Sequence, residues 1–292
     1  MGALCAYALS IGIIWIIILK HGPAIARLLS KVPLREAIGL MILQIPMLAF
    51  GGYAFQILAK NKGMPLAWQE WAGLSFIANL LNQFLPYRPG MVFRYFYLRH
   101  NYQIKPKNFM QLSFFYFGIV LTLSAAFTLG GAFQSGFLPP FHPLMMVSCL
   151  LLLIAGGSFF LLDNKVTLLF SSCPLFAMMS LTAFILWGCF WATGKPVPFV
   201  HCIFLAGVIN VALIFPITPG NIGILEGLIG LVTQHFYQDF SLGFSVCALY
   251  RATQSIASLL MGLSFGLILF TPVFFAPGKK LDFGPSPSKR VV

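Results

Sequence analysis

Three ionisable side chains lie inside or beside long apolar stretches, and they are the first candidates for chemistry. Glu226 belongs to a short apolar segment, and Arg251 lies within the last long one. Arg94 follows a Pro/Gly-rich break that itself contains Arg88. A charge at the centre of a membrane helix costs roughly 2.5–3.5 kcal/mol on insertion scales, so such residues are rare and usually functional. A polar cavity for an anionic group is one interpretation, and a structural Glu226–Arg251 pair that joins two helices is the plainer one; the two are compatible.

Two breaks of similar sequence accompany these charges. Residues 82–90 read NQFLPYRPG and residues 210–220 read NVALIFPITPG, and a short apolar segment follows each of them. A Pro pair followed by Gly ends a helix and leaves backbone groups that lipid cannot satisfy. Short, interrupted segments in matching positions of two halves indicate a transport site. The alternative is that each break is only a surface turn between two helices.

Backbone amides at the start of the helix after each break add to this chemistry. The positive end of a helix dipole and its free amides favour an anion such as phosphate. Arginine side chains can add charge-assisted hydrogen bonds to the same anion. We therefore predict a head-group binding site formed by Arg88, Gly90, Arg94, Pro219, Gly220, Asn221, Glu226 and Arg251. For the neighbouring amides we expect hydrogen bonds between helices; these are Asn82, Gln83, Asn210, Gln234 and Gln254.

The composition indicates that these residues belong to helices in a membrane. The chain has 292 residues, of which 59% are hydrophobic and 8% are charged, whereas soluble domains are about 25% charged. This excludes a cytosolic enzyme, a disordered chain and a nucleic-acid-binding domain. Lys and Arg number 18 against 6 Asp and Glu. In a membrane protein such an excess orients the chain and meets anionic lipid head groups.

The pattern of apolar segments predicts an all-α polytopic membrane protein with about six full spans and two Pro/Gly-broken re-entrant helical hairpins. We expect one transmembrane domain over residues 1–276 and a disordered basic tail over 277–292. Repeat halves at about 37–129 and 166–270 would form an inverted repeat. An amphipathic interfacial helix is expected over 21–36, with a basic loop as the alternative. The expected spans are residues 2–19, 37–58, 109–129, 143–162, 166–191 and 241–270.

Counting basic residues on the two sides leaves two topologies open. With re-entrant hairpins and the N-terminus inside, 12 lie inside and 5 outside. If residues 66–85, 198–215 and 222–236 all span and the N-terminus is outside, the counts are 14 and 3. The second topology obeys the positive-inside rule better. Residues 222–236 are short for a span and carry Glu226, so we favour the first topology, with both termini inside.

Other kinds of chemistry lack the residues they need. The six Cys show no Cys-x-x-Cys pair and are expected in the core, and the five His have no metal-ligand spacing. Nucleophile-elbow, phosphate-loop and zinc-protease motifs are missing from the sequence. We expect no enzymatic activity, no cofactor and no metal site.

At the two breaks the chain resembles the membrane domain of lysylphosphatidylglycerol synthase/flippase proteins and their stand-alone flippase-like relatives. The family pattern N-x-x-x-P-x-R-x-G-E-x-x-R is matched at Asn82, Pro86, Arg88, Gly90 and Arg94, with Met91 in place of Glu. The pattern P-x-x-P-G-G-x-G-x-x-E is matched at Pro216, Pro219, Gly220, Gly223 and Glu226, with Asn221 in place of Gly. A Tyr-Arg pair of the family resembles Tyr250-Arg251. The missing acid at position 91 removes one salt-bridge or proton site.

This resemblance implies a lipid-handling protein of the bacterial inner membrane. It would bind or translocate an anionic or isoprenoid lipid, with membrane lipids as partners and no nucleic acid. The soluble aminoacyl-transfer domain of the full synthase is missing from this chain, so lysyl-lipid synthesis is not expected. The alternative is a non-catalytic membrane partner subunit of a lipid- or glycan-modifying enzyme. A homo-oligomer is compatible with either function.

Overall fold

The structure, a computed structural model, describes residues 2–85, 87–134, 165–214 and 218–275. Within these ranges it is helical throughout and contains no β-strand. The helices are α1 (Gly2–Leu29), α2 (Leu34–Asn61), α3 (Trp68–Phe84), α4 (Pro89–Tyr102), α5 (Pro106–Gln134), α7 (Lys165–Ala192), α8 (Phe199–Ile214), the 3-10 turn η1 (Pro219–Asn221), α9 (Ile224–Tyr237) and α10 (Phe240–Phe275).

Four helices of the described part are long and apolar enough to cross a membrane, as expected of a helical membrane protein. They are α2, α5, α7 and α10, and they coincide with four of the six predicted spans. The predicted span over 143–162 and the predicted tail over 277–292 lie outside the described residues. The first predicted span, 2–19, forms part of α1.

The predicted amphipathic helix over 21–36 is wrong. Helix α1 continues through Pro23 to Leu29, and α2 starts at Leu34, directly after Pro33. The three basic residues thought to share one face are therefore divided: Arg27 is on α1, Lys31 is in the turn and Arg35 is on α2. Pro33 is the N-cap of α2, a position from which no amide hydrogen is needed for the hydrogen bonds within the helix.

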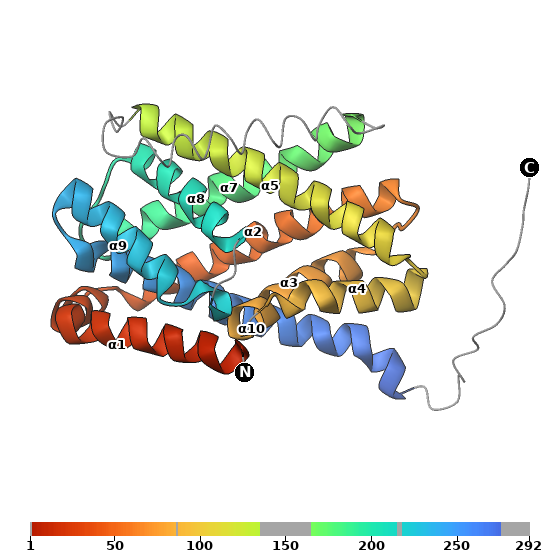
Figure 1. The fold of residues 1–292 in the computed structure, drawn as a ribbon, viewed down its shortest axis with the longest axis horizontal. Helices are drawn as coiled ribbons and strands as arrows, with labels where there is room; N and C mark the ends of the chain where they lie inside the picture. Colours follow the sequence, from red (N-terminus) through yellow and green to blue (C-terminus); the bar gives the residue numbers. More distant parts are fainter. Residues whose placement is uncertain (1, 86, 135–164, 215–217, 276–292) are drawn as a thin grey trace, which may run out of the picture.

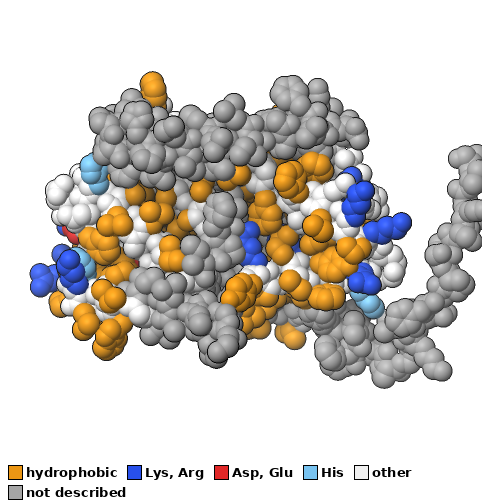
Figure 2. Space-filling view, in the orientation of Figure 1, with side chains coloured by type: hydrophobic (Ala, Val, Ile, Leu, Met, Phe, Trp, Pro, Cys, Tyr) orange, Lys and Arg blue, Asp and Glu red, His pale blue; other side chains and the backbone are white. Residues whose placement is uncertain are grey.

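Two short helix pairs enter the bundle from opposite ends of its long axis (Figure 1). We call α3 with α4 hairpin 1, and α8 with η1 and α9 hairpin 2. In Figure 1 hairpin 1 opens to the right and hairpin 2 to the left, and the long helices α2, α5, α7 and α10 run between these ends. Figure 2 shows the corresponding surface: basic side chains at both ends, apolar side chains between them, and one basic patch in the middle.

Polar contacts close each hairpin at its open end. In hairpin 1 the Glu70 carboxylate accepts hydrogen bonds from the hydroxyls of Tyr97 and Tyr102, at 2.8 and 2.7 Å. In hairpin 2 the ring of His201 contacts the hydroxyl of Tyr237 through Nδ1. Each hairpin begins and ends at the same end of the bundle. The break between its two helices therefore lies at the far tip, in the middle of the molecule.

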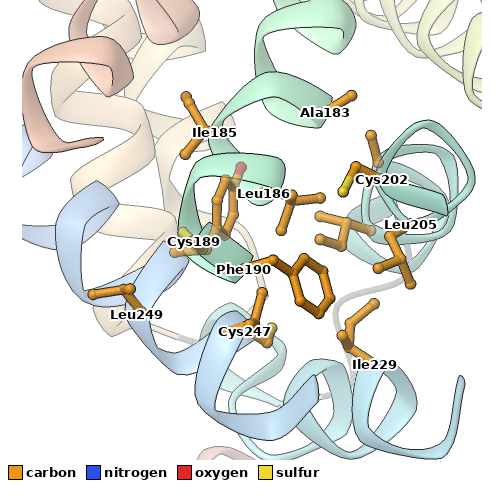
Figure 3. Close-up of a cluster of buried hydrophobic side chains, with 14 of the residues drawn as sticks. Ala183, Ile185, Leu186, Cys189, Phe190, Cys202, Leu205, Ile229, Cys247 and Leu249 are labelled. Atoms are coloured by element: carbon orange, nitrogen blue, oxygen red, sulfur yellow. The ribbon is translucent and has the colours of Figure 1, made fainter. Parts of the chain in front are cut away.

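The tightest part of the core surrounds the second hairpin (Figure 3). Phe190 of α7 is fully buried among side chains of α7, α8, α9 and α10. Three cysteines lie in this cluster, Cys189, Cys202 and Cys247, and their burial confirms the prediction for them. Cys173 is exposed instead, so for this residue the prediction is wrong.

Acidic residues of the described part all lie at helix starts. Glu36, Glu70 and Glu226 are in the first turns of α2, α3 and α9, and Asp239 directly precedes α10. Negative charge at this position interacts favourably with the helix dipole and can accept hydrogen bonds from free amides. Glu70 and Glu226 each accept one from the residue just before their helix, Ala67 and Gly223, at 2.7 Å.

Asp239 caps α10 and gives a test of the hairpin 2 end. Its carboxylate accepts from the Leu242 amide at 3.0 Å and pairs with Lys195 at 2.5 Å. Burial alone would raise the pKa of Asp239, but the hydrogen bonds from Lys195 and from backbone amides outweigh it and hold the pKa below its ordinary value. We expect Asp239→Ala to lower the free energy of unfolding by about 1 kcal/mol at pH 7.

The pH dependence of this effect has a definite sign. Because the folded-state pKa of Asp239 is lowered, its stabilisation is complete above the unfolded-state pKa and disappears as the pH falls through the folded-state value. Thermal unfolding of both proteins in detergent at pH 7 and pH 3 measures it. Equal loss at both pH values would show that the charge of Asp239 does not matter.

Candidate functional site

A cavity of about 210 Å³, lined by both polar and apolar side chains, lies where the tips of the two hairpins meet. Its walls come from α2, α3, α4, α5, α7, α8, η1, α9 and α10. The tips touch there: a Cβ added to Gly220 of η1 would lie 2.9 Å from the backbone oxygen of Gln83, near the end of α3. Met47, at the middle of α2, also lines the cavity, which places the cavity midway between the two ends of the bundle.

The first break turns the chain sharply so that Arg88 reaches this cavity. Tyr87 and Arg88 both adopt left-handed backbone conformations, with φ of 62° and 53°. This conformation costs a residue with a side chain roughly 1–2 kcal/mol. Arg88 ends up as the N-cap of α4, half-buried, with its guanidinium 4.8 Å from the centre of the Phe117 ring. Pro86, the first proline of this break, lies outside the described residues.

Arg94 is buried one and a half turns further along α4. Only 7% of its surface is exposed. Its guanidinium lies 4.8 Å from the centre of the Phe55 ring, and its Nε is 3.5 Å from the Leu74 carbonyl oxygen. Its side chain also bonds to Tyr116. The sequence-based count of basic residues included Arg94 on the inner side of the membrane; the structure places it inside the protein, where it lines the cavity.

The second break has a different backbone from the first. Here the left-handed pair is Gly220 and Asn221, with φ of 54° and 57°, and it follows Pro219 instead of preceding the second proline. Glycine and asparagine are the residues that adopt this conformation most readily. The buried Asn221 amide donates to the Ala212 carbonyl at 2.6 Å, which ties η1 to α8. Pro216 lies outside the described residues.

Arg251 and Glu226 form the predicted ion pair. Nε of Arg251 lies 3.2 Å from Oε1 of Glu226, and the two side chains are 11% and 9% exposed. Glu226 is also held by Gly223, whose amide donates to Oε2. Arg251 lines the cavity, whereas Glu226 lies behind it on α9. The carboxylate therefore holds the guanidinium through Nε, while the buried Nη1 has no hydrogen-bond partner.

Five of the eight predicted site residues line this cavity: Arg88, Arg94, Gly220, Asn221 and Arg251. Glu226 contacts it only through Arg251. Gly90 is buried and its amide donates to the Asn82 side chain at 2.9 Å, so it stabilises the start of α4. Pro219 begins η1, but its side chain lies outside the described residues.

Several cavity residues were not found from the sequence. Tyr116 of α5 contacts Arg94, and Ser75 and Thr182 add hydroxyls from α3 and α7. Tyr116 lies in the sequence SFFYFG, where a single hydroxyl among phenylalanines is a weak signal. Four amides for which helix–helix bonds were predicted also line the cavity: Asn82, Gln83, Asn210 and Gln254.

The chemistry of this site is that of binding an anion. Three arginines line it, and no acidic residue does. Among the described residues no group of three His, Cys, Asp or Glu side chains could hold a metal ion. Buried guanidinium groups bind carboxylate or phosphate through two parallel hydrogen bonds. Comparison with known proteins adds no assignment, since neither a family model nor a curated protein matches the chain.

Proposed function

We propose that this protein is a flippase-like lipid carrier that binds the head group of an anionic or isoprenoid lipid in the central cavity and moves it across the bacterial inner membrane. The observation that carries the proposal is a cavity with three arginines in a helical bundle whose outer surface is apolar. Charges at this depth are costly unless a partner compensates them. A lipid with an anionic head group would place its negative charge beside the cavity arginines and its acyl chains in the surrounding bilayer.

We infer that two units, α2–α5 and α7–α10, form an inverted repeat, and part of the helix packing supports this. Helix α2 packs against α7, its counterpart in the other unit, and two further large contacts form an exchanged pair. Helix α5, the last helix of the first unit, packs against α8 of the second unit. In the same way α10, the last helix of the second unit, packs against α3 of the first. Transporters built from inverted repeats bind substrate where their broken helices meet near the bilayer midplane.

The basic residues favour an orientation with the hairpin 1 end in the cytoplasm. Arg88 and Arg94 line the cavity, so they no longer belong in the count of loop charges. Ten basic residues remain on the hairpin 1 side, including the tail that follows α10, against five on the hairpin 2 side. For the re-entrant topology, the positive-inside rule then favours the orientation with the C-terminus inside.

Lipid translocation in reconstituted vesicles tests the function. The vesicles carry fluorescent phosphatidylglycerol or fluorescent phosphatidate, and dithionite quenches the label in the outer leaflet only. We expect the protein to expose the inner-leaflet label of at least one of these lipids. Arg88→Gln and Arg94→Gln should slow this exposure at least about tenfold, because each removes one charged hydrogen-bond donor from the cavity.

Lys195→Gln is the matched control for these variants. Lys195 is exposed at the hairpin 2 end and pairs with Asp239, away from the cavity. Like the two arginine variants, Lys195→Gln replaces one positive charge with a glutamine. We expect it to translocate lipid at the wild-type rate. Wild-type protein that exposes neither lipid, or arginine variants that are as fast as Lys195→Gln, would contradict the proposal.

A further inference from the structure

The cavity has a charge excess that the protein does not compensate. Arg88, Arg94 and Arg251 each contribute one positive charge, and Glu226 is the one acid paired with any of them in the described part of the chain. Two positive charges therefore remain. Arg94 and Arg251 are largely removed from water, and burying cations without anions is expensive.

Neutral groups around these arginines do not replace an anion. Arg88 and Arg94 each lie over an aromatic ring, Phe117 and Phe55, at 4.8 Å. A ring face attracts a cation but accepts no strong hydrogen bond from its N–H groups. The carbonyl oxygen of Leu74 is at the outer limit of hydrogen-bond distance from Arg94. The Tyr116 side chain also bonds to Arg94. All of these contacts are with neutral groups, so none of them balances the charge of Arg88 or Arg94.

Two buried polar atoms of opposite kind lack partners at the point where the hairpins meet. Nη1 of Arg251 is a donor without an acceptor, and Oε1 of Gln83 is an acceptor without a donor, and both residues line the cavity. Buried polar groups are nearly always hydrogen-bonded, so a pair like this indicates a ligand. A ligand that accepts from Arg251 would pair this donor, and one that also carries a hydroxyl would donate to Gln83.

We propose that the cavity is specific for a doubly charged phosphoryl head group, a phosphate monoester or a diphosphate, on a lipid. A dianion balances the two uncompensated arginine charges, whereas a phosphodiester such as phosphatidylglycerol leaves one of them unpaired. A phosphate monoester has its second pKa near 6 and carries about −1.5 to −2 charges at pH 7. Its phosphoryl oxygens accept from Arg251. A diphosphate with two negative charges keeps one P–OH that can donate to Gln83, whereas the dianion of a monoester has no proton to donate there. This inference rests on the proposed function and names its substrate class.

A panel of lipids that share their acyl chains tests the charge requirement on the wild-type protein. Phosphatidate is the monoester, phosphatidylglycerol the diester and diacylglycerol the uncharged member, with farnesyl diphosphate as a second dianionic lipid. Binding to the full-length protein in detergent is measured by competition. We expect phosphatidate and farnesyl diphosphate to bind at least about tenfold more tightly than phosphatidylglycerol, and diacylglycerol not to compete. Phosphatidylglycerol that binds as tightly as phosphatidate overturns the inference while the proposed function stands; failure of every lipid overturns both.

Inorganic phosphate separates a lipid ligand from a free anion. It offers the same phosphoryl group without chains, and we expect it to compete far more weakly than phosphatidate. Competition by inorganic phosphate at the same concentration as phosphatidate would overturn the lipid as the ligand.

Arginine variants localise the preference to this cavity. Arg88→Gln is the first choice, because Arg88 is half-buried and its loss disturbs the fold least. It should weaken phosphatidate binding at least about tenfold and bring the preference over phosphatidylglycerol close to one. Arg88→Lys keeps the charge and should retain most of the preference, and Lys195→Gln should retain all of it. An unchanged preference in Arg88→Gln and in Arg94→Gln, each confirmed as folded by size-exclusion chromatography, overturns the assignment to this cavity.

Discussion

Gly90→Ala should unfold hairpin 1 and abolish lipid binding, although it adds one methyl group. The new Cβ would collide with the carbonyl oxygen of Ala78 on α3 and lie 2.7 Å from its carbonyl carbon and Cα. These are backbone atoms, which cannot rotate away as a side chain can. Overpacking a tight site costs typically 1–3 kcal/mol, and the backbone contact puts Gly90→Ala at or above about 3 kcal/mol.

The loss from Gly90→Ala is measured by thermal unfolding and by phosphatidate competition. Gly130→Ala on α5 is the matched control, because a Cβ at Gly130 meets no atom within 4 Å. In a helix that substitution stabilises by roughly 0.5–1 kcal/mol, since alanine loses less conformational entropy than glycine. If Gly90→Ala unfolds at the temperature of Gly130→Ala, the close packing of α3 on α4 is not what requires glycine at position 90.

Glu226→Ala should be the most destabilising change among the charged residues. The Glu226 carboxylate accepts from Arg251 and from the Gly223 amide, and it is almost fully buried. Its removal leaves Arg251 without an anion and α9 without its cap. Removing one partner of a buried ion pair costs about 3–5 kcal/mol. We expect a loss of this size in the free energy of unfolding.

A double-mutant cycle separates the ion pair from the cap. Glu226→Gln and Arg251→Gln are compared with the double variant, in which no charge is left unpaired. The double variant should be more stable than the sum of the two single losses implies, because residues in one ion pair are coupled. Glu36→Gln in the first turn of α2 is the control for loss of an acid at a helix start. Additive losses in the cycle would mean that the pair contributes nothing to stability.

Much of the helical arrangement could be predicted from hydropathy and from the breaks. The predicted spans over 37–58, 109–129, 166–191 and 241–270 match α2, α5, α7 and α10 to within three residues, except at the C-terminal ends of α5 and α10, which each extend five residues beyond the prediction. A Pro pair followed by Gly is typical of a helix end, so the ends of α3 and α8 were also visible in the sequence. The region around Pro23 was not, because a single proline can end a helix or only bend it, and neighbouring packing decides which.

The site was predictable where charge marks it and not where packing forms it. Arg251, Arg94 and Glu226 stand out in an apolar chain because any charge there is costly. That Gly90 serves packing instead of binding, and that Tyr116 contacts Arg94, depends on which helices lie side by side. Such long-range neighbours leave no local pattern in one sequence.

Each hairpin starts and ends at the same end of the bundle. This return determines how the two proposed units are oriented relative to each other. Each unit has two full-length helices and one hairpin that returns, so each makes an even number of complete passes along the long axis. Helix α2 starts and α5 finishes at the hairpin 2 end, whereas α7 starts and α10 finishes at the hairpin 1 end (Figure 1). A tandem copy of such a unit placed directly after the first would point the same way. The end of α5 and the start of α7 accordingly lie at opposite ends of the molecule, and this sets the two proposed units, with their breaks, in opposed orientations (Figure 1).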